Sequence, residues 1–419
     1  MDHIQNYLQK MNDNRTKFYH KRLEKEKLKP MDQQNETKLY LFDFPTKEKS
    51  FLGYQFLDCL FKTMKQKDYY SLPGQINQQV LKNVVQNWKS FFESLKDYKM
   101  HPEKYSGRPS IPGYLPKGGR KETILSNQIC TIKEGKYLRF PKTNLKLNIG
   151  KLANLKGYQQ VRIIPKYDYF TVEMVILIEK KSERTTKKDR CMGIDLGLEN
   201  MATIISNTGM TPILFKGGVI KSINQWYNKM RSRYYAALRN GQKNHEGSFH
   251  SKRLLGLDKQ RYRKVKDFFH KVSYNIVKIA KENEIDTIVI GKNDHWKQEI
   301  NLGKKNNQNF VQIPHSLLIE LITYKANAEG ISVILTEESY TSKASFLDED
   351  DIPTYQSGNN QPYIFSGKRI SRGMYRSKDQ ILINADVNGA ANILRKVIPK
   401  AFTNGIAAVC SSPQVVNVH

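Results

Sequence analysis

Three acidic residues in the C-terminal half have the types and positions expected of a metal-dependent site. Asp195 lies within the apolar segment 191–197, which is expected to form a buried strand, and Glu338 directly follows the apolar, β-branched segment 331–335. Asp386 opens the last predicted helix. A carboxylate inside an apolar strand is unfavourable unless it is paired or binds a cation. Brought together, three carboxylates would repel one another, and a divalent metal ion would relieve that repulsion and support phosphodiester hydrolysis.

Each acid also has a simpler explanation. Asp195 could be a buried structural carboxylate that accepts hydrogen bonds from backbone amides. Asp386 could be a helix N-cap, for which Asp is a favoured residue. Glu338 could be a solvated acid beside Glu337. No single residue is decisive, and it is their joint placement at the ends of predicted strands and at a helix start that favours a metal site.

The elements that would position these acids alternate in type. From residue 191 onward the pattern predicts three strands, a helix, a strand, a helix, a strand, an irregular polar segment and a final helix, at 191–197, 201–206, 211–215, 216–283, 285–290, 314–329, 331–336, 341–383 and 386–396. This order is that of an RNase H-like α/β fold. Upstream, helices are expected between 54 and 98 with a break at Pro73 and Gly74, then a basic loop at 101–120 and a small β unit at 121–180.

Composition indicates the class of partner. The 419 residues include 69 Lys and Arg against 40 Asp and Glu, a net charge of +29. Such a surplus argues against most ordinary metabolic enzymes and indicates a polyanion, with nucleic acid ahead of a membrane surface. No apolar run approaches the ~20 residues of a spanning helix, and the polar N-terminus shows no signal-peptide core. We therefore expect a cytoplasmic, nucleoid-associated protein.

Several segments resemble the TnpB family, the RNA-guided nucleases of insertion sequences, which are related to type V CRISPR effectors and to Fanzor proteins. The resemblance lies in GIDLGLENMATI around Asp195, TEESYTSKASFLD at 336–348, GKRISRGMYRS at 367–377 and NADVNGAANILRK at 384–396. Two upstream segments, LPGQINQQVLKNVVQNWKSFF at 72–92 and KYSGRPSIPGY at 104–114, are also similar to this family. Together these motifs span residues from about 50 to 397.

This resemblance implies a fold and an activity. It implies an α+β protein with a RuvC-like, RNase H-fold nuclease domain and an N-terminal small β-barrel, the wedge, interrupted by a helical recognition insert. Asp195 matches the first Asp of the family's Asp-Glu-Asp metal site and Asp386 the last. The implied cofactors are two Mg²⁺ ions and a guide RNA, and the implied partner is double-stranded target DNA with an adjacent motif. The expected function is that of a transposon-encoded RNA-guided DNA endonuclease.

The position of the catalytic glutamate departs from the usual family pattern. Most members carry it in a strand of the form I-V-x-E-D-L, where this sequence has Gly291. Some TnpB lineages and Fanzor proteins have it on the next strand, ahead of a Thr-Ser pair, and Glu338 stands there ahead of Thr341 and Ser342. We therefore expect Asp195, Glu338 and Asp386 to be the catalytic and metal-binding residues. The fallbacks for Glu338 are Glu337 and the acidic run 348–351.

Zinc is a second departure. The family often has two CxxC pairs between the Thr-Ser pair and the last Asp, but residues 341–385 contain no Cys, and Ala344 and Phe346 stand where cysteines are expected. The four cysteines of the chain are scattered and form no CxxC pair, so we expect neither a zinc site nor a disulfide framework. Residues 1–35 also lack the expected first barrel strand, so the barrel is either degenerate or shortened.

Contacts with nucleic acid are expected from basic side chains and from Tyr114, a loop residue suited to stacking. The candidates are Arg108, Tyr114, Arg120, Lys252, Arg253, Arg261, Arg263, Lys264, Lys343, Lys368, Arg369, Arg372 and Arg376. The expected domains are an N-terminal arm and helical recognition region at 1–120, the wedge at 121–186, the nuclease domain at 187–340, a zinc-less nucleic-acid-binding insert at 341–383, the final nuclease helix at 384–398 and a flexible tail at 399–419.

Two other functions remain open. A catalytically inactive RNA-guided DNA-binding repressor would bind the same partners without cutting and should have a broken acidic triad. An unguided RNase H-fold DNA nuclease or transposase should cut DNA and carry no bound RNA.

Overall fold

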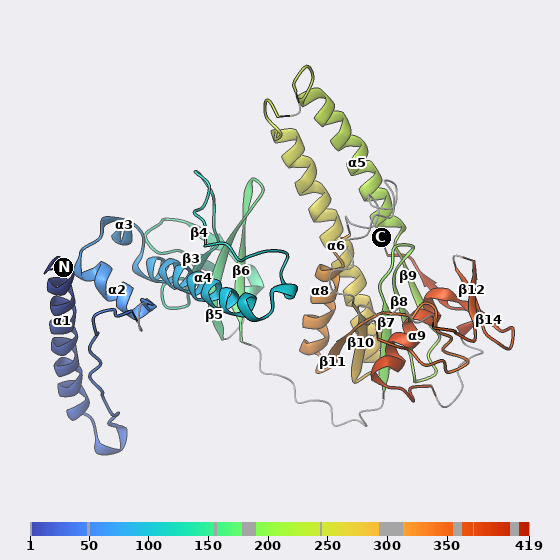
Figure 1. Ribbon diagram of the computed structural model, residues 1–419, viewed down its shortest axis with the longest axis horizontal. Coiled ribbons are helices and arrows are strands. Elements are labelled where there is room, and N and C mark those ends of the chain that lie inside the picture. The colour runs from blue at the N-terminus through green and yellow to red at the C-terminus, as the bar shows by residue number, and fades with distance from the viewer. Residues whose placement is uncertain are drawn as a thin grey trace. The chain divides into compact units, whose positions relative to one another are not determined.

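The chain is an α+β protein that divides into two compact units, Met1–Leu177 and Ile178–His419. The computed structural model describes residues 2–47, 51–154, 157–177, 190–243, 245–292, 313–354, 363–371, 373–402 and 410–418 (Figure 1). Within the described part of the chain, no helix is both long enough and apolar enough to cross a membrane.

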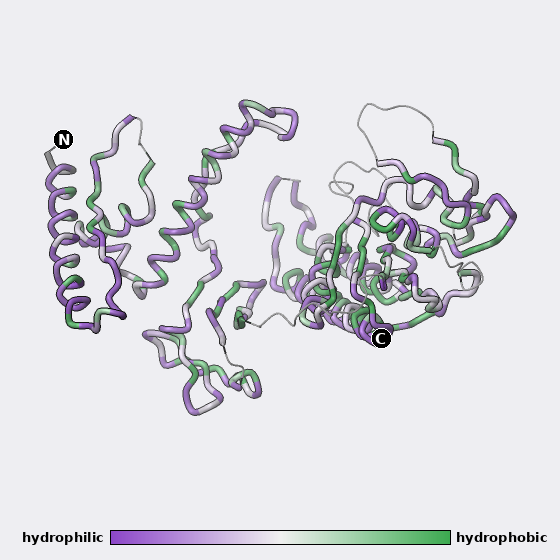
Figure 2. The backbone as a smooth tube through the Cα atoms, turned by 90° about the horizontal axis from the view of Figure 1, so that it is seen from below, coloured by the Kyte–Doolittle hydropathy of each residue, from purple (hydrophilic) through white to green (hydrophobic). Residues whose placement is uncertain are grey.

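The first unit begins with helices. They are α1 (Asp2–Lys27), α2 (Tyr54–Thr63), α3 (Lys67–Tyr70) and α4 (Gly74–Met100), with short 3-10 turns at Met31–Gln33 and Pro102–Lys104. The start of α4 directly after Pro73 confirms the predicted break. The backbone of α1 is coloured as hydrophilic along most of its length (Figure 2), as expected for a helix whose surface is largely solvated.

Two small antiparallel sheets complete this unit. One has the order β1-β5-β6 and the other the order β2-β3-β4. The strands are β1 (Thr123–Ser126), β2 (Thr131–Lys133), β3 (Tyr137–Arg139), β4 (Lys146–Asn148), β5 (Tyr158–Lys166) and β6 (Tyr169–Ile176), with a 3-10 turn at Gly150–Asn154. Their shared core contains Leu125, Leu138 and Val161. The predicted small β unit at 121–180 is confirmed.

A six-stranded sheet organises the second unit, in the order β11-β10-β7-β8-β9-β15. Its strands are β7 (Cys191–Asp195), β8 (Asn200–Ser206), β9 (Ile213–Lys216), β10 (Thr287–Gly291), β11 (Ser332–Thr336) and β15 (Gln414–Val416). Strands β7, β8 and β9 form an antiparallel meander, whereas β10 runs parallel to both β7 and β11. The five strands predicted between residues 191 and 336 are all present, in the predicted sequence along the chain.

The helices cover both faces of this sheet. They are α5 (Gly218–Leu238), α6 (Lys252–Glu282), α8 (His315–Ala328) and α9 (Ala385–Val397). Met192 and Ile194 of β7 share one core with Phe269 of α6, while Cys191 shares another with Leu394 of α9. Because strand residues alternate between faces, Asp195 belongs to the face that α9 covers. The single long helix expected within 216–283 is in fact a projecting pair, α5 and α6 (Figure 1).

Two other expectations are wrong. The tail at 399–419 was expected to be flexible, but β15 pairs parallel with β9 at the sheet edge, and Cys410 is buried. The segment 341–383 was expected to be irregular, but β12 (Lys368–Ser371) and β13 (Met374–Arg376) form a three-stranded sheet with β14 (Leu382–Asn384). Both corrections involve strands of three or four residues, whose periodicity is too short to detect, and tertiary packing stabilises them.

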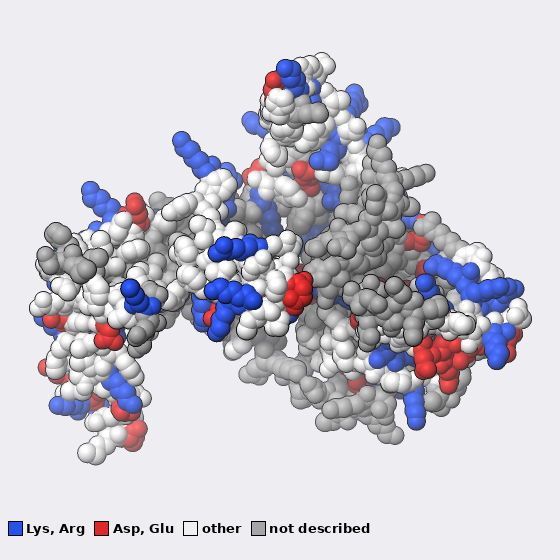
Figure 3. Space-filling model, viewed as in Figure 1, with Lys and Arg blue, Asp and Glu red and all other residues white. Residues whose placement is uncertain are grey.

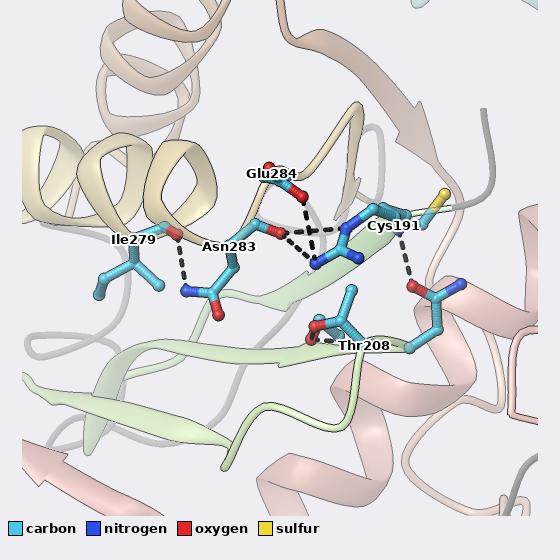
Figure 4. A network of polar contacts seen from close by, with 8 residues as sticks. Cys191, Thr208, Ile279, Asn283 and Glu284 are labelled. Atoms are coloured by element: carbon cyan, nitrogen blue, oxygen red, sulfur yellow. Dashed lines mark hydrogen bonds and ion pairs between the residues drawn. The ribbon is translucent and has the colours of Figure 1, made fainter. Parts of the chain in front are cut away.

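A polar network fixes the start of β7. The Cys191 backbone N–H donates to Asn207 Oδ1 at 2.8 Å, which ties β7 to the turn that follows β8 (Figure 4). On the other side, the Arg190 guanidinium donates from Nη2 to the Asn283 carbonyl at 3.0 Å and lies 3.9 Å from a Glu284 carboxylate oxygen. The strand that ends at Asp195 is therefore held at its beginning from two directions.

Asn207→Ala should lower the melting temperature of the protein, because it leaves the N–H of buried Cys191 without this acceptor. The expected loss is about 1–3 kcal/mol, or roughly 2–4 °C for each kcal/mol. Asn275→Ala is the matched control, since the Asn275 amide makes only an exposed bond to a carbonyl of its own helix. Differential scanning calorimetry measures both variants, and an equal melting temperature for the two would contradict the anchoring role.

Candidate metal-binding active site

The fold places the three predicted acids at one edge of the sheet. Asp195 is the last residue of β7, and Glu338 lies two residues beyond the end of β11. Because β7, β10 and β11 are parallel, their C-terminal ends meet at the same edge. Asp386 is the second residue of α9, the helix packed on β7, β8 and β10. All three residues are half-buried.

Asp386 is not the N-cap of its helix. That position belongs to Asn384, whose Oδ1 accepts hydrogen bonds from the N–H groups of Asp386 at 3.0 Å and Val387 at 3.2 Å. The Asp386 side chain is instead held by Asn200, whose Nδ2 donates to Oδ2 at 2.7 Å. Its other oxygen lies 3.7 Å from Arg369 Nη2. The capping explanation for Asp386 is therefore excluded.

The charges of Glu338 and Asp386 act on Asp195. Burial raises the pKa of Asp195 well above its usual range, and the negative charges of Glu338 and Asp386 raise it further. The positive charge of Arg369 acts in the opposite direction. A buried carboxylate whose pKa is raised by two neighbouring acids is characteristic of functional sites.

Glu338 and Glu337 are neighbours with different partners. Burial raises the pKa of Glu338 to about 7, and the adjacent Glu337 contributes to the increase. Glu337 forms an ion pair with Lys396 of α9 and accepts a hydrogen bond from the Ser339 N–H at 2.6 Å. Glu338, in contrast, interacts with Asp195. The ion pair of Glu337 with Lys396 thus favours Glu338 over its fallback Glu337.

The acidic run 348–351 is engaged elsewhere. Asp350 accepts from the Ser345 N–H at 2.8 Å and from the Ser366 hydroxyl at 2.6 Å, and Asp348 accepts from the Lys378 N–H at 2.9 Å. These bonds organise the insert between β11 and α9. The run therefore has a structural use that does not involve Asp195.

Glycines make room for the acidic side chains. A Cβ atom on Gly291 would lie 2.7 Å from Glu338 Cγ and 2.6 Å from Ile393 Cδ1. A Cβ on Gly389 of α9 would lie 2.7 Å from Asp195 Oδ2. Both separations are below normal contact distances, so a larger residue would displace the carboxylate. The glycine that departs from the family pattern is therefore the residue that leaves space for Glu338.

Two residues of this site were not predicted from the sequence. Asn200 is buried at the start of β8, and Lys216 ends β9. Lys216 Nζ donates to Asn200 Oδ1 at 3.0 Å, and Asn200 in turn donates to Asp386. A polar residue opening an apolar strand was the available signal for Asn200. The pair holds Asp386 through a chain of hydrogen bonds.

The donor set fits a hard divalent cation. Carboxylate oxygens are the ligands that Mg²⁺ prefers, and a cation would offset the repulsion that raises the pKa of Asp195. In the described ranges, no three Asp, Glu, His or Cys side chains are already gathered at metal-coordinating distances. The three carboxylates are therefore close enough to interact electrostatically without forming a ready-made ligand cluster.

The predicted nucleic-acid contacts fall in different settings. In the first unit, Arg108, Tyr114 and Arg120 are exposed in the segment before β1, with the Arg120 guanidinium 5.5 Å from the centre of the Phe170 ring. In the second unit, most basic candidates are exposed, and Figure 3 shows Lys and Arg side chains over the projecting α5–α6 pair. These exposed residues are Lys252, Arg253, Arg263, Lys264, Lys343, Lys368 and Arg369.

Three candidates differ from the rest. Arg261 is half-buried and donates from Nε to Asn224 Oδ1 at 2.8 Å, so it helps to join α5 and α6. Arg376 is half-buried in β13. Arg372 lies outside the described residues. Arg261 is therefore a weaker candidate for binding nucleic acid than its exposed neighbours on α6.

Comparisons with known proteins identify two family domains. Residues 173–297 match the OrfB_IS605 family model, described as a probable transposase, and residues 315–393 match the Cas12f1-like TNB domain. No curated protein sequence gives a significant match. The two matched segments include Asp195, Glu338 and Asp386.

Similar solved structures include three effector complexes. A Cas12f1–sgRNA–target DNA complex is 14% identical, with 74% of this chain and 70% of that chain covered and a TM-score of 0.42. A CRISPR–Cas12f ternary complex is 14% identical, with 94% and 82% covered and a TM-score of 0.36. Alicyclobacillus acidoterrestris C2c1 with single-guide RNA is 11% identical, with 84% and 27% covered and a TM-score of 0.29.

Asp195→Asn should stabilise the metal-free protein at pH 8. The raised pKa values of Asp195 and Glu338 mean that the folded state binds more protons than the unfolded state, so stability falls as pH rises from 4.5 towards about 7. Removing one charge should recover on the order of 1 kcal/mol, or roughly 2–4 °C, at pH 8.

The effect of the same substitution should be smaller at pH 5, where Glu338 is protonated. Thermal melting in EDTA at the two pH values measures the difference. A variant that is no more stable than wild type at pH 8 would show that these acids do not repel one another.

Proposed function

The chain belongs with the TnpB and Cas12f-like proteins, and we propose that it is a transposon-encoded, RNA-guided DNA endonuclease. The observation that carries this proposal is the convergence of Asp195, Glu338 and Asp386 at one edge of the central sheet, within the two matched family domains. Each of the three is contributed by a different element, β7, the segment after β11, and α9.

The fold of the second unit supports a RuvC-like nuclease domain. A meander of three antiparallel strands, followed by two strands that add parallel to its first strand, is the arrangement expected of an RNase H-like sheet. The helix that carries the last acid packs on the face that bears Asp195. In the first unit, we assign the two small sheets to the wedge and α2–α4 to the recognition insert.

The chemistry follows from the donor set. Asp195, Glu338 and Asp386 would hold Mg²⁺, which when bound activates water and stabilises the leaving oxygen of a phosphodiester. Asn200 and Lys216 hold the Asp386 carboxylate in place. Arg369 is an exposed cation beside Asp386, and we assign it to the DNA backbone next to the cleaved bond.

The partners follow from charge and family. A net charge of +29 suits a protein that binds both a guide RNA and a DNA duplex. Base pairing with the guide would read the target sequence, and the protein would read a short adjacent motif. The exposed basic residues of both units, including Arg108, Lys252 and Lys368, would bind phosphates. Such a protein would act in the cytoplasm, on nucleoid DNA.

A guided but inactive DNA-binding repressor is the second candidate function. The specific observation in its favour is Gly291, which replaces the glutamate found in most family members. The placement of Glu338 beside Gly291 argues against it, because the space left by the missing side chain contains a carboxylate.

Purification with the native flanking DNA tests the guided mechanism. A single defined RNA with a constant scaffold and a variable end should copurify, and RNA sequencing detects it. With Mg²⁺, the complex should cut DNA that matches the guide. Asp195→Ala should abolish cutting and leave RNA binding unchanged, which separates catalysis from assembly.

The other functions predict different results. Heterogeneous RNA, or none, would overturn the guided mechanism and leave an unguided nuclease. A wild-type complex that binds its target tightly without cutting, at any Mg²⁺ concentration, would favour the repressor.

Gly291→Ala should reduce Mg²⁺-dependent cleavage on the order of 100-fold, because its Cβ would displace Glu338 by a fraction of an ångström or more. Gly256→Ala is the matched control, since a Cβ there, near the start of α6, meets nothing within 4 Å. That control should cut at the wild-type rate and melt at the same or a higher temperature. Single-turnover cleavage assays measure both, and equal rates would contradict the assignment of Glu338.

A further inference from the structure

A groove in the first unit contains no residue of the quoted motifs that resemble the TnpB family. It has a volume of about 830 Å³ and is lined by one face of α1, by residues 36–40 of the following extended segment, and by α2. Arg15, Phe18 and Arg22 recur at helical spacing along that face of α1. Neither the proposed metal site nor the predicted nucleic-acid contacts include any residue of this groove.

The groove is a built feature of the fold. Asn12 of α1 exchanges two hydrogen bonds with the backbone of Phe42, at 3.0 and 2.9 Å, which fixes the extended segment against the helix. Arg15 donates from Nε to the Tyr40 carbonyl, and its guanidinium lies 4.4 Å from the centre of the Phe42 ring. Met11, next to Asn12 on α1, is fully buried. The walls are therefore held by specific interactions.

Two aromatic rings are exposed in this groove. The exposed fraction is 70% for Phe18 and 66% for Tyr40, although α1 is otherwise a polar helix. An isolated apolar ring on a solvated helix adds nothing to the core. Flat aromatic side chains in a groove are well suited to stacking on unpaired bases.

The charges of the groove suit an anionic ligand. Its two carboxylates are already engaged, Glu36 with Lys38 at 3.3 Å and Asp58 with Lys62 at 2.7 Å. Arg22 is exposed and lies one helical turn beyond Phe18, on the same face. A cation one turn from an exposed ring can bind a phosphate while the ring stacks on a base.

We propose that this groove binds an unpaired segment of nucleic acid, with bases stacked on Phe18 and Tyr40 and a phosphate bound by Arg22. The identity of the bound strand rests on the proposed function. In that function, unpaired nucleotides come from the guide RNA or from the displaced DNA strand. The chemistry of recognition is shared by the two, because stacking and phosphate binding require neither a particular base nor a particular sugar.

Photocrosslinking tests the proposal directly. The full-length protein is irradiated with single-stranded probes of about 12 nucleotides, one an RNA with 4-thiouridine and one a DNA with 4-thiothymidine, and crosslinked peptides are mapped by mass spectrometry. Mapping is needed because a protein with a charge of +29 also binds such probes elsewhere. Crosslinks are expected on the peptides that contain Phe18 and Tyr40.

Matched variants make the test specific. Phe18→Ala and Tyr40→Ala should each reduce crosslinking at the groove roughly tenfold, since stacking on one ring is worth about one order of magnitude in affinity. Leu28→Ala is the control for Phe18, because Leu28 is 87% exposed just beyond α1 and does not line the groove. Lys21→Ala is the control for Arg22→Ala, since it removes the same charge from an adjacent exposed position.

The outcomes distinguish the possible occupants. Crosslinking of the RNA probe alone assigns the groove to the guide, and of the DNA probe alone to the displaced strand, while crosslinking of both supports binding without sugar preference. No crosslink at the groove, or equal yields in Phe18→Ala and Leu28→Ala, would overturn the proposal. The probes require neither a guide nor cleavage, so a failure of guided cutting leaves this result standing, and the reverse also holds.

Discussion

The repulsion among three carboxylates is the constraint on which the second unit depends. Burial raises the pKa of Asp195, and the charges of Glu338 and Asp386 raise it further, so the fold holds the three acids near one another at a cost in stability. Packing elsewhere in the unit, above all of α9 against β7, offsets this loss of stability. A Cβ on Gly193 would lie 2.5 Å from the Ala390 carbonyl oxygen, so helix and strand approach to a distance that only glycine permits. This close contact brings Asp386 to the edge where β7 ends.

Glycine also explains how a glutamate can serve the site from a different strand. Strands β10 and β11 are parallel neighbours, with Gly291 paired to Thr336, so a side chain that follows β11 can reach the space beside the end of β10. The end of β10 is where most family members place the glutamate, and here the Glu338 side chain occupies the space that a Cβ of residue 291 would need. The carboxylate can stay near Asp195 while its backbone moves by one strand. Gly291 and Glu338 are thus coupled sterically, because the glutamate side chain fits where residue 291 has no Cβ.

Sequence patterns predicted the longer elements well and the short ones poorly. The central strands and α9 have clear apolar periodicity, and the structure places them close to the predicted residues. Strand β15 and the sheet β12-β13-β14 have three or four residues each, and it is pairing with neighbours distant in sequence that stabilises them. The division of 216–283 into α5 and α6 was missed because both helices share a basic, amphipathic pattern. The acidic residues of the site could be predicted from their positions and from family motifs. The residues that hold them, Asn200 and Lys216, could not be predicted.

Asn200 illustrates why the residues that hold the acids could not be predicted from the sequence. It lies 186 residues from Asp386 in the sequence, and only the approach of α9 to β8 makes it a donor to that carboxylate. The same helix acts at its other end, where Lys396 in the last turn pairs with Glu337. The positive end of the α9 dipole faces the acids, and its negative end is next to the cation. One helix thus places its positive end at the acids and keeps Glu337 in an ion pair with Lys396, while the charge of the adjacent Glu338 acts on Asp195.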